Sequence, residues 1–418
     1  SIDIFDSVGS NIRVDSRAEE ILRVTPRTNE YINEEWISDK VRFNYDGYYQ
    51  QRIDTPYIKE NQKLSISNWE ESLKVLKDKL KTLKPLALIG EHVDLETGYA
   101  IKKFMSNYGK DNVECRTDNH AILESLDSYR FNTPLNDIEN SDLIILVGTN
   151  PKIETPIINH KIFKAYNNDA KVFNIGENIS LNYKTEYLGE NLSSLNNENL
   201  IKALKKSTNP LIIIGSAFLN KIKNIKTLKS IFSYADKYKV ITKEKNNLNF
   251  LNPYASRVGQ LIIGNTTNNL CEPFSNLKKD NFELVLSFGS EHIANDQFNN
   301  CFKVYFGHHG DDGAMGSDIV LPTPLYTEKN GTFVNIEGRP QEAKKCHNPI
   351  GSAKEEWSIL KKLSDELSFD FTPNTFDQLR SELFDKYPIL SDYHEIIAVE
   401  NSTSITPDIE FEDCKAEY

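Results

Sequence analysis

The chain has 418 residues, a formal net charge of −12 at pH 7 and a hydrophobic content of 39%. Its length allows two or three domains with a large core, because domains typically hold about 100–200 residues. The acidic balance argues against a nucleic-acid or anionic-lipid surface. No apolar run approaches the roughly 18 residues of a membrane-spanning helix, so we expect any membrane association to come through partner proteins.

The five cysteines lie far apart, and no two of them form a C-x-x-C pair: Cys115, Cys271, Cys301, Cys346 and Cys414. This spacing excludes a sequence-local zinc or iron–sulfur site, although ligands could still converge in space. Scattered thiols in a chain of this size favour a reducing compartment and free cysteines. The sequence begins at Ser1 without a methionine, and we expect a processed or partial chain whose upstream part is removed or carried elsewhere.

Two local patterns mark the first part of the chain. Alternating residues from Asn11 to Pro26, with polar residues from Asp15 to Glu19 between them, predict a β-hairpin. From Ser67 to Leu83, apolar residues recur at three- and four-residue spacing. Because Ser67 and Glu70 form a capping box, this stretch predicts an amphipathic helix.

A repeated plan follows, in which short apolar runs end at a glycine and helical patterns separate them. The runs are Leu86–Gly90, Leu143–Gly148, Leu211–Gly215 and Leu284–Gly289. A helix is predicted from Asp94 to about Met105, and further strands at Lys171–Gly176 and Val240–Thr242. Near-continuous Ile, Leu and Val strands that alternate with helices indicate a parallel sheet covered on both faces. We therefore predict an α/β fold with doubly wound, mostly parallel sheets.

The segment from Cys301 to Gln341 combines the most unusual features. A predicted strand from Phe302 to Gly307 leads into a glycine-rich loop, and a second apolar run from Asp318 to Leu321 follows. Ligands of doubly wound sheets bind beyond the carboxyl ends of the strands, so this loop is where we would expect chemistry. The glycine spacing matches neither G-x-G-x-x-G nor G-x-x-x-x-G-K-[ST], which argues against a phosphate cradle.

Four polar side chains of this loop allow two interpretations: His308, His309, Asp311 and Asp312. They could bind a metal or act as an acid and a base. Alternatively, they could cap backbone groups of a turn. We favour capping, because adjacent histidines in an extended loop are expected to point in opposite directions and not to share one ion.

Other loops also allow both a structural and a functional interpretation. Gly148-Thr-Asn-Pro151 is typical of a tight turn in which Asn-Pro starts the next segment. Glu91-His92 and Glu291-His292 hold equivalent positions after two strands, as polar strand exits or as metal ligands. The remaining histidines have no partner at ligand spacing, and we expect them to be surface or capping residues: His120, His160, His347 and His394.

Towards the end of the chain the sequence becomes more polar. Asn, Lys and Ser dominate Lys243–Ser256 and Asn265–Asn281, which we expect to be surface connections. Glu355–Leu367 is predicted to be an amphipathic helix with Trp357, Leu360, Leu363 and Leu367 facing inward.

A last helix and a tail follow. Thr375 and Gln378 are expected to cap a helix that ends near Phe384. The acidic residues from Asn401 to Tyr418 have little to bury, and we expect an exposed strap over a partner.

Several motifs together resemble one protein family. Residues Tyr326–Gln341, YTEKNGTFVNIEGRPQ, look like the T-x-x-N-x-E-G-R-x-Q segment of the molybdopterin oxidoreductase superfamily. With GHHGD and with LVGTNP at Leu146–Pro151, they resemble the largest iron–sulfur subunit of NADH:ubiquinone oxidoreductase, respiratory complex I. Ser1–Ile12 and Asn33–Phe43 are similar to the middle portion of that subunit.

This resemblance implies a division of the chain and a set of cofactors. We expect a small β-rich domain at 1–56 that is a cluster-free remnant, an α/β core of two lobes at 57–370, and a helix with a polar tail at 371–418. In molybdopterin enzymes the first region holds a [4Fe–4S] cluster on cysteines, but here none precedes Cys115, and Ser38-Asp-Lys40 stands at the last ligand position. We therefore expect no catalytic, cofactor-binding or metal-binding residue in this chain.

The resemblance also implies a function and partners. We expect a scaffolding part of the peripheral arm of complex I, supporting NADH-to-ubiquinone electron transfer coupled to proton translocation. FMN and iron–sulfur clusters are expected in partner subunits, including a cysteine-rich iron–sulfur chain that contacts Ser1 to Gly47. The expected location is the matrix side of the mitochondrial inner membrane, or the cytoplasmic face of a bacterial plasma membrane.

Two other functions remain open at this point. The chain could be a fragment of an active molybdopterin-dependent oxidoreductase that binds its cofactor across the loops after Gly90, Gly148 and Gly307. It could also be a stand-alone α/β protein that binds a small molecule.

Overall fold

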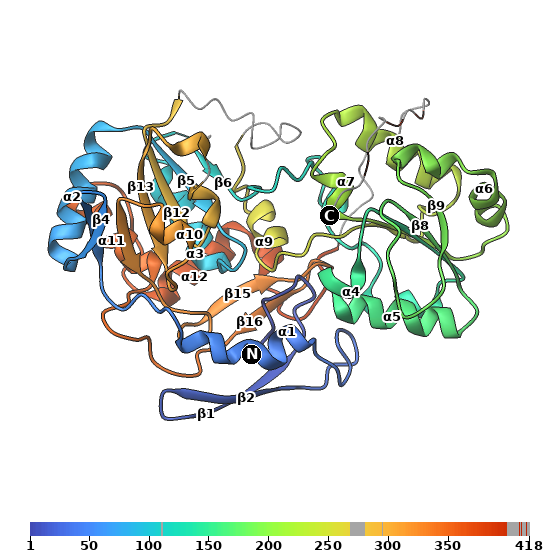
Figure 1. The fold of residues 1–418 in the computed structure, drawn as a ribbon, viewed down its shortest axis with the longest axis horizontal. Coiled ribbons are helices and arrows are strands. Elements are labelled where there is room, and N and C mark those ends of the chain that lie inside the picture. The colour runs from blue at the N-terminus through green and yellow to red at the C-terminus, as the bar shows by residue number, and fades with distance from the viewer. Residues whose placement is uncertain are drawn as a thin grey trace.

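The chain folds into two α/β lobes joined by an N-terminal segment and a central hairpin (Figure 1). The computed structural model describes residues 1–109, 112–267, 281–294 and 296–398, together with residues 409, 411 and 415. The predicted fold class is confirmed, because the sheets of both lobes consist mostly of parallel strands with helices on both faces.

The larger sheet has the strand order β4-β3-β14-β13-β12-β5-β6. Its strands are β3 Tyr57–Glu60, β4 Lys63–Ile66, β5 Pro85–Ile89, β6 Val113–Glu114, β12 Leu284–Phe288, β13 Phe302–Gly307 and β14 Ile319–Pro322. The strands from β14 to β6 are parallel, and β3 and β4 continue the sheet in antiparallel pairing. Alternate residues of β5 point to opposite faces, so Ala87 and Ile89 join one core while Leu86 and Leu88 join the other.

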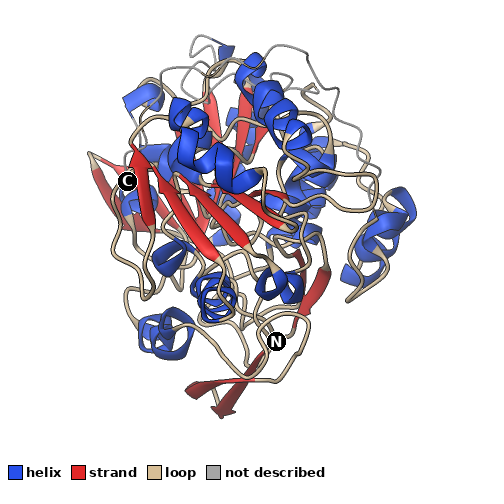
Figure 2. Cartoon of the chain, turned by 90° about the vertical axis from the view of Figure 1, so that its right-hand side faces the viewer, coloured by secondary structure: helices blue, strands red, loops and turns tan. Residues whose placement is uncertain are grey.

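The second sheet is parallel throughout, in the order β11-β10-β7-β8-β9. Its strands are β7 Leu143–Val147, β8 Lys171–Ile175, β9 Glu186–Gly189, β10 Pro210–Ile214 and β11 Leu248–Phe250. The apolar runs of β7 and β10 are buried on both faces, as the unbroken hydrophobic sequence predicts. Figure 2 shows helices on both sides of a parallel sheet.

The helices cover these sheets and fill the space between the lobes. They are α1 Asp39–Phe43, α2 Trp69–Thr82, α3 Leu95–Met105, α4 Pro151–Glu154, α5 Pro156–Asn167, α6 Glu198–Leu204, α7 Ser216–Leu219, α8 Ile225–Lys237, α9 Arg257–Ile262, α10 Asp312–Met315, α11 Glu356–Leu367 and α12 Phe376–Lys386. Helices α2, α3, α11 and α12 pack in one core of the larger lobe. No helix in the described ranges is long and apolar enough to cross a membrane.

The N-terminal segment runs beneath the central hairpin of β15 Gly331–Val334 and β16 Pro340–Ala343. The Ile336 N–H donates to the Ser7 carbonyl at 2.7 Å, and the Gln341 side-chain amide donates to the Gly9 carbonyl at 3.0 Å. The predicted hairpin near the start is confirmed as β1 Ile12–Arg17 and β2 Glu20–Pro26.

Two helix starts can be compared with their predicted caps. The cap of α2 lies one residue later than predicted, because the Asn68 carboxamide accepts from the Glu71 N–H while the Ser67 hydroxyl donates to the Glu71 carboxylate. The prediction for α12 is confirmed, since the Thr375 hydroxyl accepts from the Gln378 N–H.

The stretch from Val240 to Ser256 differs from expectation. The predicted strand at Val240–Thr242 is wrong: the backbone turns there, and the Thr242 N–H donates to the Lys245 carbonyl. The strand is β11, further along, and its three residues are buried. The expectation of a surface connection at Lys243–Ser256 is therefore wrong at its centre.

The later segments are only partly described. Helix α11 buries Leu360 and Leu363, with Trp357 and Leu367 packed partly buried against the same core, as predicted. Most of the Asn265–Asn281 connection and most of the Asn401–Tyr418 tail lie outside the described residues.

Candidate functional site

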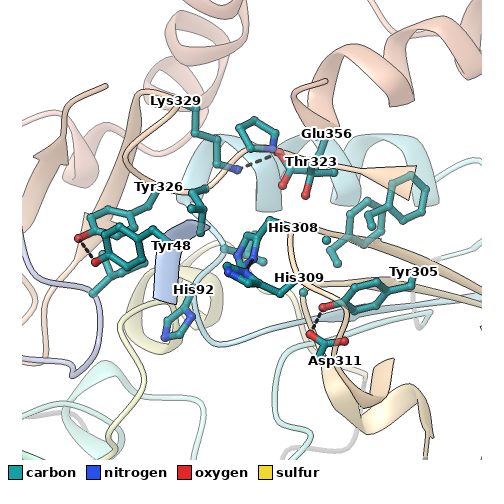
Figure 3. Close-up of a pocket in the computed structure, with 18 of the residues that line it drawn as sticks. Tyr48, His92, Tyr305, His308, His309, Asp311, Thr323, Tyr326, Lys329 and Glu356 are labelled. Carbon is teal, nitrogen blue, oxygen red and sulfur yellow. Dashed lines mark hydrogen bonds and ion pairs between the residues drawn. The ribbon is translucent and has the colours of Figure 1, made fainter. Parts of the chain in front are cut away.

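A cavity of the larger lobe has a volume of about 380 Å³ and lies beyond the carboxyl ends of β5, β12, β13 and β14 (Figure 3). This is the position where doubly wound sheets bind ligands. It is lined by Ile4, Phe5, Asn44, Gly47, Tyr48, His92, Val93, Phe288, Gly289, Glu291, Tyr305, Phe306, Gly307, His308, His309, Asp311, Thr323, Pro324, Leu325, Tyr326, Lys329 and Glu356. The glycine-rich loop and the N-terminal segment thus meet around one space.

The two adjacent histidines of the loop lie together, contrary to the prediction that they point apart. Their Nδ1 atoms are 2.6 Å apart, and the rings are perpendicular with centroids 4.8 Å apart (Figure 3). Both residues follow the end of β13, where the backbone leaves the extended conformation, so strand alternation no longer separates them. The Nε2 atom of His309 contacts the Gly47 carbonyl at 3.0 Å.

The capping interpretation of the loop is confirmed at Asp311. Its carboxylate accepts from the Ala314 N–H at 2.9 Å and so caps α10. The other carboxylate oxygen accepts from the Tyr305 hydroxyl across the cavity wall. Burial together with this carboxylate holds the pKa of Tyr305 above its usual value.

A buried lysine closes another side of the cavity. The Lys329 Nζ atom lies 2.8 Å from the Asp94 carboxylate and 2.8 Å from the Glu356 carboxylate. Asp94 also accepts from the Thr97 N–H and thereby caps α3 as predicted. Burial raises the pKa of Glu356 despite the nearby ammonium group, so the triad carries at most one uncompensated negative charge.

The two Glu-His dipeptides behave as strand exits. His92 turns its ring into the cavity and meets the Phe5 ring edge-on, with centroids 5.6 Å apart. Desolvation among these atoms lowers the pKa of His92 to about 4. In the described part of the chain, no three His, Cys, Asp or Glu side chains gather as a metal site.

Glu91 is not among the residues that line the cavity, and it is half-buried. Its carboxylate is hydrogen-bonded to the Tyr254 hydroxyl. Burial raises the pKa of Glu91 to about 7, although the nearby Arg257 opposes this shift.

We expect Glu91→Gln to change how stability depends on pH. The folded protein holds the Glu91 proton up to about pH 7, whereas an unfolded glutamate loses it near pH 4.5. Wild-type stability is therefore expected to fall between pH 4.5 and 7.5 by about 2–3 kcal/mol more than that of the variant. Urea unfolding of both proteins at the two pH values measures this difference, and Glu60→Gln, an exposed site on β3, should leave the wild-type slope intact. Equal slopes for wild type and Glu91→Gln would contradict the prediction.

A second buried polar cluster was not visible in the sequence. The Arg257 guanidinium lies 2.8 Å from the Asp118 carboxylate, and both side chains are almost fully buried. His120 is 1% exposed beside them, and burial lowers its pKa to about 3. The expectation of a surface or capping role is therefore wrong for His120, since the loop that carries it runs inside, between the lobes.

The other histidines that we expected to be surface or capping residues differ in how far they are buried. His347 is buried, and its Nε2 atom lies 3.1 Å from the Thr327 hydroxyl, so the surface expectation is wrong there as well. His160 is half-buried with its ring against Trp36. His394 is exposed, as predicted.

The remaining predictions concern a turn and the cysteines. Gly148 has a φ of +61°, and α4 begins directly after Asn150, so the tight turn is confirmed. Cys115, Cys301 and Cys346 are free thiols, as expected for a reducing compartment. Cys271 and Cys414 lie outside the described residues.

Comparison with known proteins adds family information. Residues 52–366 match the molybdopterin oxidoreductase family, and residues 1–46 match the NADH-ubiquinone oxidoreductase NDSU1/NuoG-like 4Fe-4S domain. The chain is 37% identical over 407 residues to a NADH-quinone oxidoreductase subunit of Rickettsia bellii, covering 95% of this chain and 59% of that protein. It is 36% identical over 434 residues to the NADH-ubiquinone oxidoreductase 75 kDa subunit of Reclinomonas americana, covering 96% and 62%. The chain thus spans about three fifths of these relatives.

The fold comparison agrees with these matches. Acetylene hydratase from Pelobacter acetylenicus superposes with a TM-score of 0.67 at 11% identity, covering 96% of this chain and 74% of that structure. At this identity the likeness concerns the fold alone.

The 4Fe-4S match corrects the expectation that this chain carries no cofactor, because it points to iron–sulfur binding within the chain. Residues 1–46 themselves contain neither cysteine nor histidine, and cysteine thiolates are the usual cluster ligands. The Ser38 hydroxyl, at the expected ligand position, instead accepts from the Val41 N–H and caps α1. These side chains alone do not fit a cluster, and no chemical step is assigned to one.

The cavity can be tested in the same way for a pterin dinucleotide. A pyrophosphate needs free donors or cations, but Lys329 is the one Lys or Arg among the described lining residues and already pairs with two carboxylates. Glu291 and Asp311 add further negative charge to the wall. The lining therefore does not fit that anion.

Proposed function

Because this chain belongs to the molybdopterin oxidoreductase family, and is homologous over 95% of its length to proteins named as NADH-quinone oxidoreductase subunits, we propose that it is a structural part of the peripheral arm of respiratory complex I. In this role it supports electron transfer from NADH to ubiquinone coupled to proton translocation, without itself being catalytic. It reaches the membrane through partner subunits, on the matrix side in mitochondria or on the cytoplasmic face in bacteria.

One observation carries this proposal: the charged side chains of the 326–341 segment serve internal contacts. The Glu328 carboxylate forms a bidentate pair with Arg52 at 2.9 and 2.8 Å. Lys329 is held by the buried carboxylates of α3 and α11. A segment whose ionic groups pair with residues before and after it in the chain acts as a connector between the N-terminal segment and the core.

Glu337 extends this pattern. Its carboxylate accepts from the Arg339 guanidinium at 2.8 Å and from the Leu135 N–H at 3.0 Å. The segment therefore also joins the larger lobe to the chain leading into the second sheet. This internal use of every acidic group in the segment favours a framework over a reaction centre.

The proposed partner contact lies in Ser1 to Gly47, on the β-rich domain proposed for residues 1–56. Of the eleven large apolar side chains that are exposed in the described residues, four lie within Ser1 to Gly47: Leu22, Tyr31, Trp36 and Phe43. A contiguous apolar patch marks a protein–protein interface, and we propose that these side chains contribute to one. The partner that we propose is a cysteine-rich iron–sulfur chain of the same complex, and we keep 57–370 as the proposed core and 371–418 as the proposed C-terminal part.

We expect replacement of Trp36 and Phe43 by serine to weaken assembly. The two side chains are 48% and 63% exposed, so their loss should leave the isolated fold intact. Burying each ring at an interface contributes about 1.5–3 kcal/mol, so the double variant should bind its partner at least about tenfold more weakly. Blue-native electrophoresis of cells that express tagged chain measures the fraction that migrates with NADH dehydrogenase activity.

A matched control is Ile225→Ser, because Ile225 is similarly exposed on α8 in the other lobe. The control should migrate with the large complex like the wild type. Co-purification of a cysteine-rich chain in equal amount with wild type, but not with the double variant, would support the partner proposal. A wild-type chain that migrates alone would contradict the proposed function.

A further inference from the structure

The wall of this cavity combines aromatic rings with polar side chains, and apolar surface predominates. Six aromatic carbocycles line it: Phe5, Tyr48, Phe288, Tyr305, Phe306 and Tyr326. Phe288 and Phe306 stack with centroids 4.4 Å apart, and the hydroxyls of Tyr48 and Tyr326 bond to each other at 2.9 Å. The Tyr305 hydroxyl donates a hydrogen bond to the Asp311 carboxylate. A ligand would therefore meet mostly apolar surface.

The histidine pair fixes the position of its own protons. The Gly47 carbonyl can only accept a hydrogen bond, so His309 carries its proton on Nε2 and donates from there. A neutral His309 then has a bare Nδ1, which accepts from Nδ1–H of His308 at 2.6 Å. Two protonated Nδ1 atoms could not approach to this distance. Burial lowers the pKa of both rings, in agreement with a neutral pair.

This pairing leaves His308 with an acceptor atom whose position is fixed. With its proton on Nδ1, His308 presents a lone pair on Nε2, and no described residue donates to that atom. His308 itself lines the cavity and lies among the other lining side chains in Figure 3. The backbone holds the residue in place, because the His308 carbonyl accepts from the Ile53 N–H at 3.0 Å and from Arg52 Nε at 3.1 Å.

We propose that this cavity binds an uncharged, ring-sized apolar molecule whose hydroxyl or N–H group donates to His308 Nε2. The volume of about 380 Å³ is in the usual range for small-molecule sites, which are mostly apolar with a few fixed polar groups. Charge excludes anions, since acidic side chains line the wall and its one lysine is already paired. A metal ion would need at least three ligands, and no such group of His, Cys, Asp or Glu side chains includes His308 in the described residues.

The test compares 2-naphthol with naphthalene, which has the same rings but no donor, by isothermal titration of the full chain. Wild type is expected to bind 2-naphthol about tenfold more tightly, the difference that one buried hydrogen bond provides. His308→Phe keeps the ring volume and removes the acceptor, so its affinity ratio should fall to about one. His308→Gln, which retains an acceptor oxygen, should keep part of the preference.

Two controls keep the result interpretable. His394→Asn changes an exposed histidine far along the chain and should show the wild-type ratio. Thermal melting of each variant verifies that it is folded at the titration temperature. The proposal is overturned if wild type shows no saturable binding, if it binds the two compounds equally, or if the preference survives in His308→Phe. Stoichiometric zinc binding that His308→Phe abolishes would also overturn it.

Discussion

Replacing Lys329 with methionine is expected to lower the free energy of unfolding by about 3–5 kcal/mol, the usual effect of removing one partner from a buried ionic group. The substitution keeps the side-chain length but leaves the carboxylates of Asp94 and Glu356 without their cation. Both carboxylates are buried, so water compensates only poorly for the lost ammonium group. Urea unfolding at pH 7 measures the loss.

A matched control variant and a compensating second substitution test this prediction. Lys152→Met removes an exposed lysine of α4 and should change stability by no more than about 0.5 kcal/mol. Adding Glu356→Gln to Lys329→Met removes one of the unpaired charges and should restore part of the loss. A change below about 1 kcal/mol for Lys329→Met would show that the triad does not contribute as its geometry implies.

The second large effect is expected at Arg52. Its guanidinium joins the Glu328 carboxylate in two parallel hydrogen bonds and also donates to the Tyr48 carbonyl at 2.9 Å. Arg52→Met leaves Glu328 fully buried without its cation, although the Leu325 N–H still donates to that carboxylate. We expect a loss of about 2–4 kcal/mol, somewhat smaller than at Lys329 because of this remaining donor.

The arginine also holds the N-terminal segment against the loop after β13. Limited proteolysis of Arg52→Met should therefore show earlier cleavage before residue 52 than wild type does. Arg17→Met, on the exposed hairpin, serves as the control and should match wild type in both measurements. Unchanged proteolysis together with reduced stability would mean that Arg52 stabilises the core without fastening that segment.

Much of the secondary structure could be predicted because its signals are local. The runs that became β5, β7, β10 and β12 are rich in Ile, Leu and Val, and each is buried on both faces. β11 was missed because its three residues, Leu248–Phe250, stand in a polar stretch and become a strand only by pairing with β10. Short strands of this kind depend on tertiary partners more than on their own composition.

The site could be located from the sequence, but its contacts could not. The loop after Phe302–Gly307 was predicted to lie at the ligand-binding edge, and the cavity is there. In the sequence, Lys329 lies more than 200 residues from Asp94 and 27 residues from Glu356. No local sequence pattern predicts contacts of this kind. The prediction that His308 and His309 point in opposite directions assumed an extended backbone, but the strand β13 ends at Gly307.

The course of the first residues beneath β15 and β16 has a consequence for biosynthesis. The carbonyls of Val8 and Gly9 receive their donors from Asn335 and Gln341, 327 and 332 positions later. On a ribosome that adds about 5–20 residues per second, this stretch must wait on the order of half a minute before its docking surface exists. Until then its apolar side chains, including Ile2 and Ile4, are open to chaperones and to aggregation.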